Sequence, residues 1–191
     1  MSVVSRFHLT APEHASCFHV SRFIFFPMQD TTLVFLLKYG PPSEVLLGYK
    51  KMGFGQGKYT GFGGKIEPGE TVAEAASREL AEETGILIPA ASLESVATLL
   101  FIFPHKPQCS QRVHVFTAYK WEGEPTESDE MRPQWFAVNT IPYGQMWDDA
   151  RYWLPRLLSR EKFRARFIFN GDNETVGDVE IEKLRLSHNS P

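Results

Sequence analysis

Three glutamates, Glu79, Glu82 and Glu83, stand at positions i, i+3 and i+4 of one short segment. In a helix this spacing makes their carboxylates converge, because one turn takes about 3.6 residues. Converging like charges repel one another, and withdrawing them from bulk water costs further free energy. A divalent cation resolves both problems, and hard oxygen ligands favour Mg²⁺, with Mn²⁺ as a substitute. The spacing therefore predicts a metal site, and a solvated acidic helix is the structural alternative.

The ends of that helix are also encoded in the sequence. Pro68 and Gly69 form a turn dipeptide, and Thr71 followed by Glu74 fits a capping box at the start of a helix. Gly85 stands where a glycine cap ends a helix. We predict a helix over residues 72–84.

Neighbouring residues favour the metal interpretation. Val72 and Ala76 fall between or beside the glutamates on the helical wheel, so we expect the acidic trio to share the inward face. Arg78 comes directly before Glu79 and four residues before Glu82, where its guanidinium can orient both carboxylates.

A glycine-rich loop over residues 50–64 precedes the helix. Glycines let backbone approach a ligand closely and present amide donors to phosphate oxygens. The interleaved Phe54, Tyr59 and Phe62 favour an anchored loop over a merely flexible one.

The segment 64–86 fits the Nudix box, G-x5-E-x7-R-E-U-x-E-E-x-G-U, in which U is apolar. Its fixed positions are filled by Gly64, Glu70, Arg78, Glu79, Leu80, Glu82, Glu83, Gly85 and Ile86. The sequence thus resembles the Nudix hydrolases, which hydrolyse a nucleoside diphosphate linked to a further group with the help of divalent metal ions.

The resemblance implies a role for each matching residue. The metal ligands it implies are the carbonyl of Gly63 and the carboxylates of Glu79, Glu82, Glu83 and Glu130. It makes Arg78 the residue that holds the glutamates in register, and it places Gly64 and Lys65 at the substrate phosphates. Glu70 bonds within the box, and which glutamate activates water stays open.

Segments outside the box narrow the resemblance. VLLGYKK, GFGQGKYTGFGGK, ESDEMRP and MWDDARYW resemble the oxidised purine nucleoside triphosphatases within the Nudix hydrolases, the 8-oxo-dGTP diphosphatases or MutT homologues. That resemblance implies hydrolysis of 8-oxo-dGTP, oxidised dATP or methylated purine triphosphates to monophosphate and pyrophosphate. The resemblance, together with the flat or adaptable surfaces of several side chains, suggests a set of base-binding residues. They are Lys50, Phe54, Thr60, Phe101, Phe103, Met131, Trp147, Asp149 and Trp153. Each apolar member has ordinary core packing as its alternative.

The chain departs from that group in two places, at Thr60 and in the segment after Trp147. Thr60 stands where the group has an asparagine that reads the base. With the flanking tryptophans aligned, Asp149 and Ala150 take the places of two consecutive aspartates, and Asp148 replaces a proline. A one-residue slip would pair both aspartates instead. If Asp149 is buried, its raised pKa lets it donate a hydrogen bond to a purine edge. The preferred damaged base stays open.

Composition sets the broader limits. The chain has 191 residues and a formal net charge of -3, which gives no basic field for polymeric nucleic acid. No apolar run approaches the ~20 residues that cross a bilayer. Two cysteines, Cys17 and Cys109, fit a reducing compartment. We expect a cytoplasmic monomer, with a mitochondrial or nuclear location as the alternative.

We predict an α+β protein with the Nudix fold, an α/β/α sandwich around a mixed sheet. Residues 28–186 would form the domain, 1–27 an extension that adds an edge strand or is partly ordered, and 187–191 a frayed end. Strands are expected over 31–37, 45–49, 95–103, 112–121, 133–138, 164–170 and 178–186, with a second helix over 152–162.

Three other functions remain at this point. One is a Nudix hydrolase of another substrate, such as a dinucleotide, a sugar nucleotide or a capped RNA end. A second is a non-catalytic nucleotide-binding module, which the complete box disfavours. The third is a scaffold dimer that uses Trp121 and Trp135.

Overall fold

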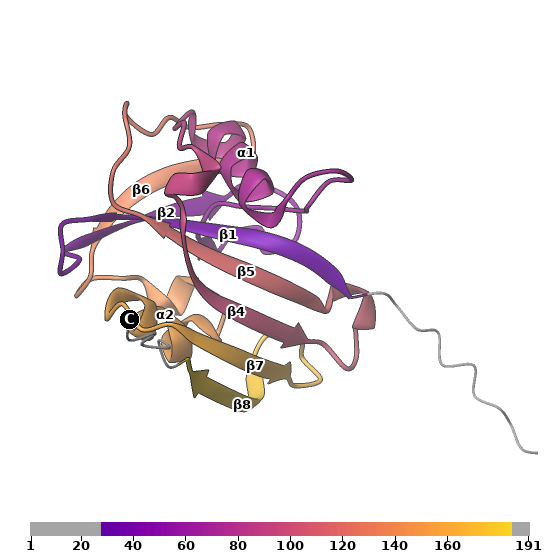
Figure 1. Cartoon of the computed structure of the whole chain (residues 1–191). Coiled ribbons are helices and arrows are strands. Elements are labelled where there is room, and N and C mark those ends of the chain that lie inside the picture. Colours follow the sequence, from indigo (N-terminus) through magenta and orange to yellow (C-terminus); the bar gives the residue numbers. More distant parts are fainter. Residues whose placement is uncertain (1–27, 185–191) are drawn as a thin grey trace, which may run out of the picture.

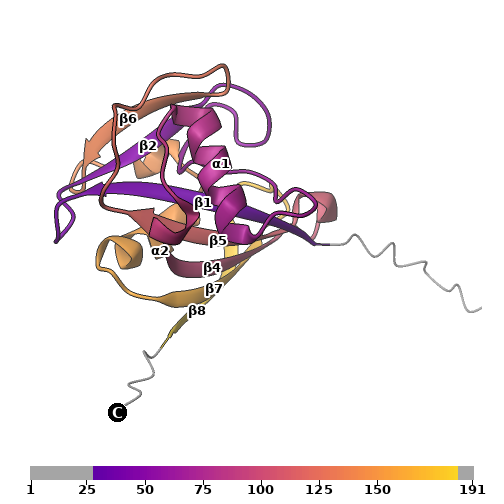
Figure 2. The ribbon, with the colours of Figure 1, turned by 45° about the horizontal axis from the view of Figure 1, so that its top comes forward.

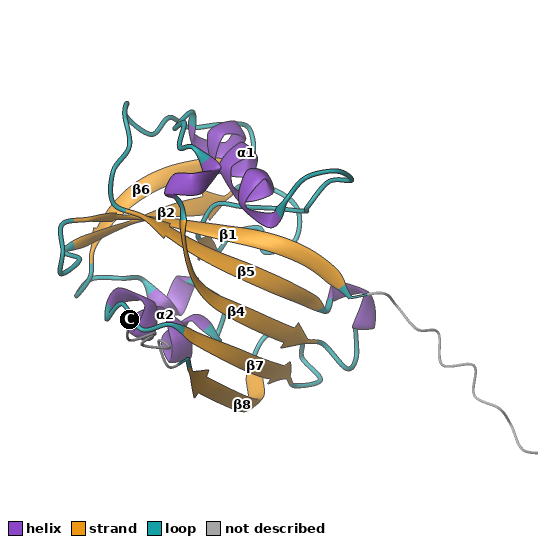
Figure 3. Cartoon of the chain, viewed as in Figure 1, coloured by secondary structure: helices purple, strands orange, loops and turns teal. Residues whose placement is uncertain are grey.

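The computed structural model describes residues 28–184, so the expectations for 1–27 and 187–191 lie outside the described residues. The strands are β1 (Gln29–Lys38), β2 (Glu44–Lys50), β3 (Tyr59–Thr60), β4 (Glu94–Ile102), β5 (Gln111–Ala118), β6 (Met131–Ala137), β7 (Phe163–Phe169) and β8 (Val176–Lys183). The helices are α1 (Val72–Thr84) and α2 (Ala150–Leu158), and Figure 3 shows the helices, strands and loops in separate colours.

The strands form one mixed sheet. Their order is β3-β2-β1-β5-β4-β7-β8, and β6 pairs with β2 beside this path. Strand β1 is parallel to β5 and antiparallel to β2, while β4 is antiparallel to β5 and parallel to β7. The mixed sheet and the two predicted antiparallel pairs, β1 with β2 and β4 with β5, are therefore confirmed.

The two helices cover opposite faces of this sheet (Figure 1). Side chains alternate across a strand, so β1 contributes to two apolar clusters. Phe35 points toward α2 and meets Trp153 edge to face at 5.6 Å between ring centroids. Val34 belongs to the other cluster, which contains Leu80 of α1. The predicted layering, helix on sheet on helix, is confirmed.

Helix α1 has the ends that its sequence predicts. The Thr71 side chain accepts a hydrogen bond from the Glu74 backbone N–H, and the Glu74 side chain accepts from the Thr71 N–H. Gly85 closes the helix in the left-handed conformation, with φ of 75°. Figure 2 shows α1 lying across one face of the sheet, in front of β1. Its position is therefore fixed by local bonds as well as by packing.

Helix α2 differs from the prediction, because it ends at Leu158 and β7 begins at Phe163. Arg160 takes a left-handed φ of 59°, which no residue inside an α-helix can hold. The apolar face that supported the prediction ends at Leu158, so the predicted extension over the polar residues 159–162 is wrong. The glycine-rich loop also contains an unpredicted short strand, β3, which pairs with β2.

Strand β5 ends at Ala118 instead of residue 121. Trp121 lies beyond the strand and stacks on Trp135 of β6 at 5.6 Å between ring centroids. Within residues 28–184, neither helix is long and apolar enough to span a lipid bilayer.

Candidate active site

Glu83 lies on the inward face of α1 and is only 5% exposed. Its Oε2 accepts a 2.8 Å hydrogen bond from the backbone N–H of Gly63, and its Oε1 lies 3.8 Å from Lys50 Nζ. Burial raises the pKa of Glu83 to about 7, although the bond from Gly63 and the charge of Lys50 oppose the rise. The negative charges of Glu79 and Glu130 raise it further. This carboxylate is thus buried among other carboxylates.

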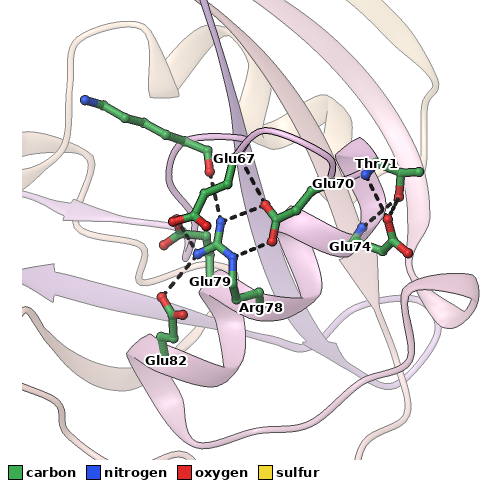
Figure 4. A network of polar contacts seen from close by, with 8 residues as sticks. Glu67, Glu70, Thr71, Glu74, Arg78, Glu79 and Glu82 are labelled. Atoms are coloured by element: carbon green, nitrogen blue, oxygen red, sulfur yellow. Dashed lines mark hydrogen bonds and ion pairs between the residues drawn. The ribbon is translucent and has the colours of Figure 1, made fainter.

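Arg78 joins the turn before α1 to the acidic face of the helix (Figure 4). Its Nε donates to Glu70 Oε1 at 2.6 Å, and its Nη2 donates to the other Glu70 oxygen at 3.0 Å. Its Nη1 donates to Glu79 at 3.0 Å and to Glu82 at 3.2 Å. Its Nη2 also donates to the backbone carbonyl of Lys65 at 3.0 Å. One guanidinium therefore orients two of the glutamates, and the predicted bonding of Glu70 within the box is confirmed.

Gly63, which precedes the box, and Gly64, its first residue, are both required because neighbouring atoms approach them closely. A Cβ atom on Gly64 would lie 2.5 Å from Glu79 Oε1, and one on Gly63 would overlap the backbone carbonyl of Thr32. The backbone N–H of Thr32 donates to the Gly64 carbonyl at 2.8 Å, which fixes the loop to β1. Larger residues would push the loop away from the glutamates.

The acidic trio does not lie wholly inward. The Glu82 side chain is 59% exposed, because it precedes Glu83 by about 100° of helical rotation and so faces solvent. Glu130 comes from the loop before β6, and its side chain is likewise largely exposed, with Oε2 3.6 Å from Lys50 Nζ. The prediction of one inward acidic face holds for Glu83, in part for the half-buried Glu79, and is wrong for Glu82.

The carboxylate oxygens here are donors of the type that a hard divalent cation takes, although in the part of the chain that the structure describes they do not form a ready-made cluster. Glu79 and Glu83 both have raised pKa values, for which burial is the first cause and the charge of Glu130 a further one. No three acidic, histidine or cysteine side chains of residues 28–184 stand at metal-binding distance from one another. In this structure the positive charges beside the carboxylates come from the protein: Arg78 pairs with Glu79, and Lys50 pairs with Glu83.

A cavity of about 160 Å³ opens beside these groups. All nine residues predicted to bind the base line it, as do Gly63 and Gly64 of the box. Residues that the prediction missed also line it: Thr31, Thr32, Leu33, Phe35, Gly55, Tyr59, Gly61, Gln111, Val113, Met146, Ala150 and Phe169. The cavity and the acidic helix are therefore parts of one site.

Aromatic side chains form much of the cavity wall. Trp147 stacks with Phe54 at 5.0 Å between ring centroids and 25° between ring planes. Phe103 stacks on Phe169 at 4.2 Å. Phe169 was missed because it ends the β7 strand, where its place in an alternating pattern reads as ordinary core. Flat apolar surfaces of this kind suit a purine ring.

Asp149 and Asp148 have different environments. Asp149 is 4% exposed and accepts a 2.7 Å hydrogen bond from Trp153 Nε1. Burial raises the pKa of Asp149 to about 6, in the direction predicted from sequence. Asp148 accepts from the backbone N–H of Val176 at 2.9 Å and pairs with Arg151 at 2.8 Å. Asp149 and Ala150 line the cavity, whereas Asp148 is not among its lining residues. This pattern agrees with the alignment that keeps the tryptophan spacing.

Lys65 was expected at the substrate phosphates. It is exposed, and its backbone carbonyl accepts from Arg78. Its contact with phosphate remains a prediction.

Comparisons with known proteins agree with this geometry. A profile of the NUDIX domain matches residues 28–157. The chain is 46% identical to the oxidized purine nucleoside triphosphate hydrolase of Danio rerio, over 82% of this chain and 100% of that protein. It is also 46% identical to the Mus musculus protein of the same name, over 80% of this chain and 94% of that one.

A solved structure is similar in fold. The crystal structure of a MutT protein from Bacillus halodurans superposes with a TM-score of 0.69 at 23% identity, covering 81% of this chain and 98% of that one. The predicted fold is therefore confirmed, and the chain belongs to the NUDIX domain family of hydrolases.

Proposed function

We propose that this protein hydrolyses oxidised purine nucleoside triphosphates to the monophosphate and pyrophosphate, using Mg²⁺. The observation that carries the proposal is one shared cavity. Trp147 and Asp149 line it, and so do Gly63, Gly64 and Lys50. A purine held among the aromatic side chains would extend its phosphates toward the acidic helix. The Danio rerio and Mus musculus relatives support this substrate class through their names.

Nudix hydrolases generally need a divalent metal ion. The groups that would hold it here are the carbonyl of Gly63 and the carboxylates of Glu79, Glu82, Glu83 and Glu130. When bound, Mg²⁺ neutralises phosphate charge and lowers the pKa of an attacking water.

The surrounding residues position these ligands. Arg78 holds Glu79 and Glu82 through its Nη1, and it takes its own orientation from Glu70. The backbone N–H of Gly63 fixes one oxygen of Glu83 and leaves the other facing Lys50. The absence of side chains at Gly63 and Gly64 lets substrate phosphates approach the loop, and Lys65 supplies a positive charge there.

The cavity supplies base recognition. Stacking of a base on an aromatic side chain contributes roughly 1–3 kcal/mol, and Trp147 and Phe103 provide such surfaces. Because its pKa is about 6, a fraction of Asp149 is protonated near neutral pH and can donate to an acceptor on the purine edge. Thr60 and Ala150 contribute one hydroxyl and a methyl group, so base choice rests mainly on Asp149.

Steady-state kinetics with Mg²⁺ tests the proposal. The panel contains normal and oxidised purine triphosphates, a dinucleotide, a sugar nucleotide and a capped RNA end, with pyrophosphate and phosphate measured separately. We expect the highest kcat/KM for an oxidised purine triphosphate, with pyrophosphate as the second product. Equal cleavage of dGTP and 8-oxo-dGTP would remove the basis for base selection, and phosphate release would place attack on another phosphorus.

A further inference from the structure

Lys50 connects the two halves of the site. Its Nζ lies 3.6 Å from Glu130 Oε2 and 3.8 Å from Glu83 Oε1. Both distances are longer than a good hydrogen bond, so the ammonium pairs with each carboxylate by charge alone. The same side chain lines the cavity that contains Trp147 and Asp149. Lys50 can therefore face either the carboxylates or a ligand in the cavity.

The backbone of Lys50 is held by hydrogen bonds, whereas its ammonium is held by longer ionic contacts. Its N–H donates to the Lys58 carbonyl at 3.0 Å, and its own carbonyl accepts from the Gly57 N–H at 2.8 Å. Among residues 28–184, the ionic partners of the ammonium lie at 3.6 Å and 3.8 Å. A change in the charge near Glu83 and Glu130 would therefore move the side chain and leave β2 in place.

A divalent cation and the Lys50 ammonium compete for the same negative charge. Both are attracted to Glu83 and Glu130, and they repel each other when they share these carboxylates. We propose that Lys50 is an exchangeable counter-ion: it pairs with Glu83 and Glu130 in the metal-free protein, and when a divalent cation binds it turns to an acceptor atom of the nucleotide in the cavity. This inference rests on the proposed function.

The exchange makes metal and nucleotide binding cooperative. When the metal binds, the Lys50 ammonium is freed to turn into the cavity, where its positive charge strengthens nucleotide binding. By thermodynamic linkage, the nucleotide must strengthen metal binding by the same factor. Lys51 supplies the matched control, because its Nζ pairs with Glu127 at 2.9 Å.

The first test measures Mn²⁺ affinity without nucleotide, by electron paramagnetic resonance of the free ion. Lys50→Met keeps the length of the side chain and removes the competing charge. We expect Lys50→Met to bind Mn²⁺ at least about fivefold more tightly than wild type, at the lower end of typical coupling between sites. Lys51→Met should match wild type. An unchanged or weaker Mn²⁺ affinity in Lys50→Met overturns the inference.

The second test measures the coupling itself. The probe is a purine triphosphate analogue with an imido bridge between its α and β phosphorus atoms, titrated with and without Mn²⁺. In wild type and Lys51→Met, Mn²⁺ should tighten analogue binding by about fivefold or more. In Lys50→Met the factor should be clearly smaller, because only the direct attraction between the metal ion and the phosphates remains. A factor that is the same in all three proteins contradicts the exchange.

Two controls keep the outcomes distinct. Lys50→Arg retains the charge, so its Mn²⁺ affinity should stay close to that of wild type, and tightening as large as that expected for Lys50→Met would overturn the inference even if Lys50→Met fails to fold. If wild type binds no Mn²⁺, the metal centre of the proposed function fails. If wild type binds Mn²⁺ and turns over substrate while Lys50→Met shows wild-type affinity, only the counter-ion role fails.

Discussion

The acidic box and the base cavity are built in opposite ways. The box draws most of its side-chain bonds from one continuous segment, in which Arg78 reaches Glu70, Glu79 and Glu82. The cavity collects side chains from distant parts of the chain, such as Phe54 before α1 and Phe169 at the end of β7. Local bonds can preserve the first region through changes elsewhere, whereas the second depends on the whole sheet. Variants in each region should therefore fail in different ways.

The largest expected effect comes from Glu83→Gln. The amide keeps the shape of the side chain and can still accept from the Gly63 N–H, so the fold should persist. Loss of the buried negative charge should reduce kcat with Mg²⁺ by about 10²–10⁴-fold, the range for removing a positioned catalytic group. Glu67→Gln, in the exposed turn, is the control. Wild-type turnover by Glu83→Gln would show that the box is not the reactive centre.

Asp149→Asn tests the cavity through pH. The pKa of Asp149 rises from 3.8 to about 6 on folding, so the folded protein binds more protons than the unfolded chain between these values. Stability therefore falls as pH rises through this window. Asparagine does not titrate, so between pH 4 and 7 wild type should lose about 2 kcal/mol relative to the variant. Urea unfolding of both proteins measures this difference, and a pH-independent difference would show that Asp149 is not buried as a charged group.

Trp147→Ala separates the two regions directly. Loss of the stacking surface should lower kcat/KM for the oxidised substrate about five- to a hundredfold, corresponding to roughly 1–3 kcal/mol. Mn²⁺ affinity measured without nucleotide should stay at the wild-type value, because the box is held by its own bonds. Equal losses of metal and substrate binding would mean that the two regions are not independent.

Thr71→Ala is the mildest change. It removes the side-chain acceptor for the Glu74 N–H at the start of α1, and such caps contribute about 1 kcal/mol. Thermal unfolding should occur at a lower temperature, while kcat at 25 °C stays near wild type. A large loss of kcat would mean that the capping box positions the glutamates as well as starting the helix.

These two modes of construction also explain what the sequence could predict. Helix α1 was predicted to the residue because Thr71, Glu74 and Gly85 encode its ends locally. The outward position of Glu82 was missed, since the wheel alone does not say which edge of an acidic face meets the sheet. The end of α2 was missed because nothing in its apolar spacing reveals the left-handed Arg160.

The cavity was predicted only in part for the same reason. Its nine named residues line it, yet the naming depended on resemblance to a family more than on any pattern of spacing. Phe169 and Ala150 approach the others only through the pairing of β4 with β7 and the packing of α2 against β1. Such long-range placement carries no local signal in one sequence.

The central claim is that one cavity brings a stacked purine and a metal-bound phosphate chain together. A crystal of the protein with Mn²⁺ and the imido-bridged analogue of 8-oxo-dGTP tests it most directly, through anomalous scattering from manganese. The account predicts anomalous density between Glu83 and the Gly63 carbonyl, with the purine against Trp147 and its edge at Asp149. Manganese bound away from α1, or a purine outside this cavity, would contradict it.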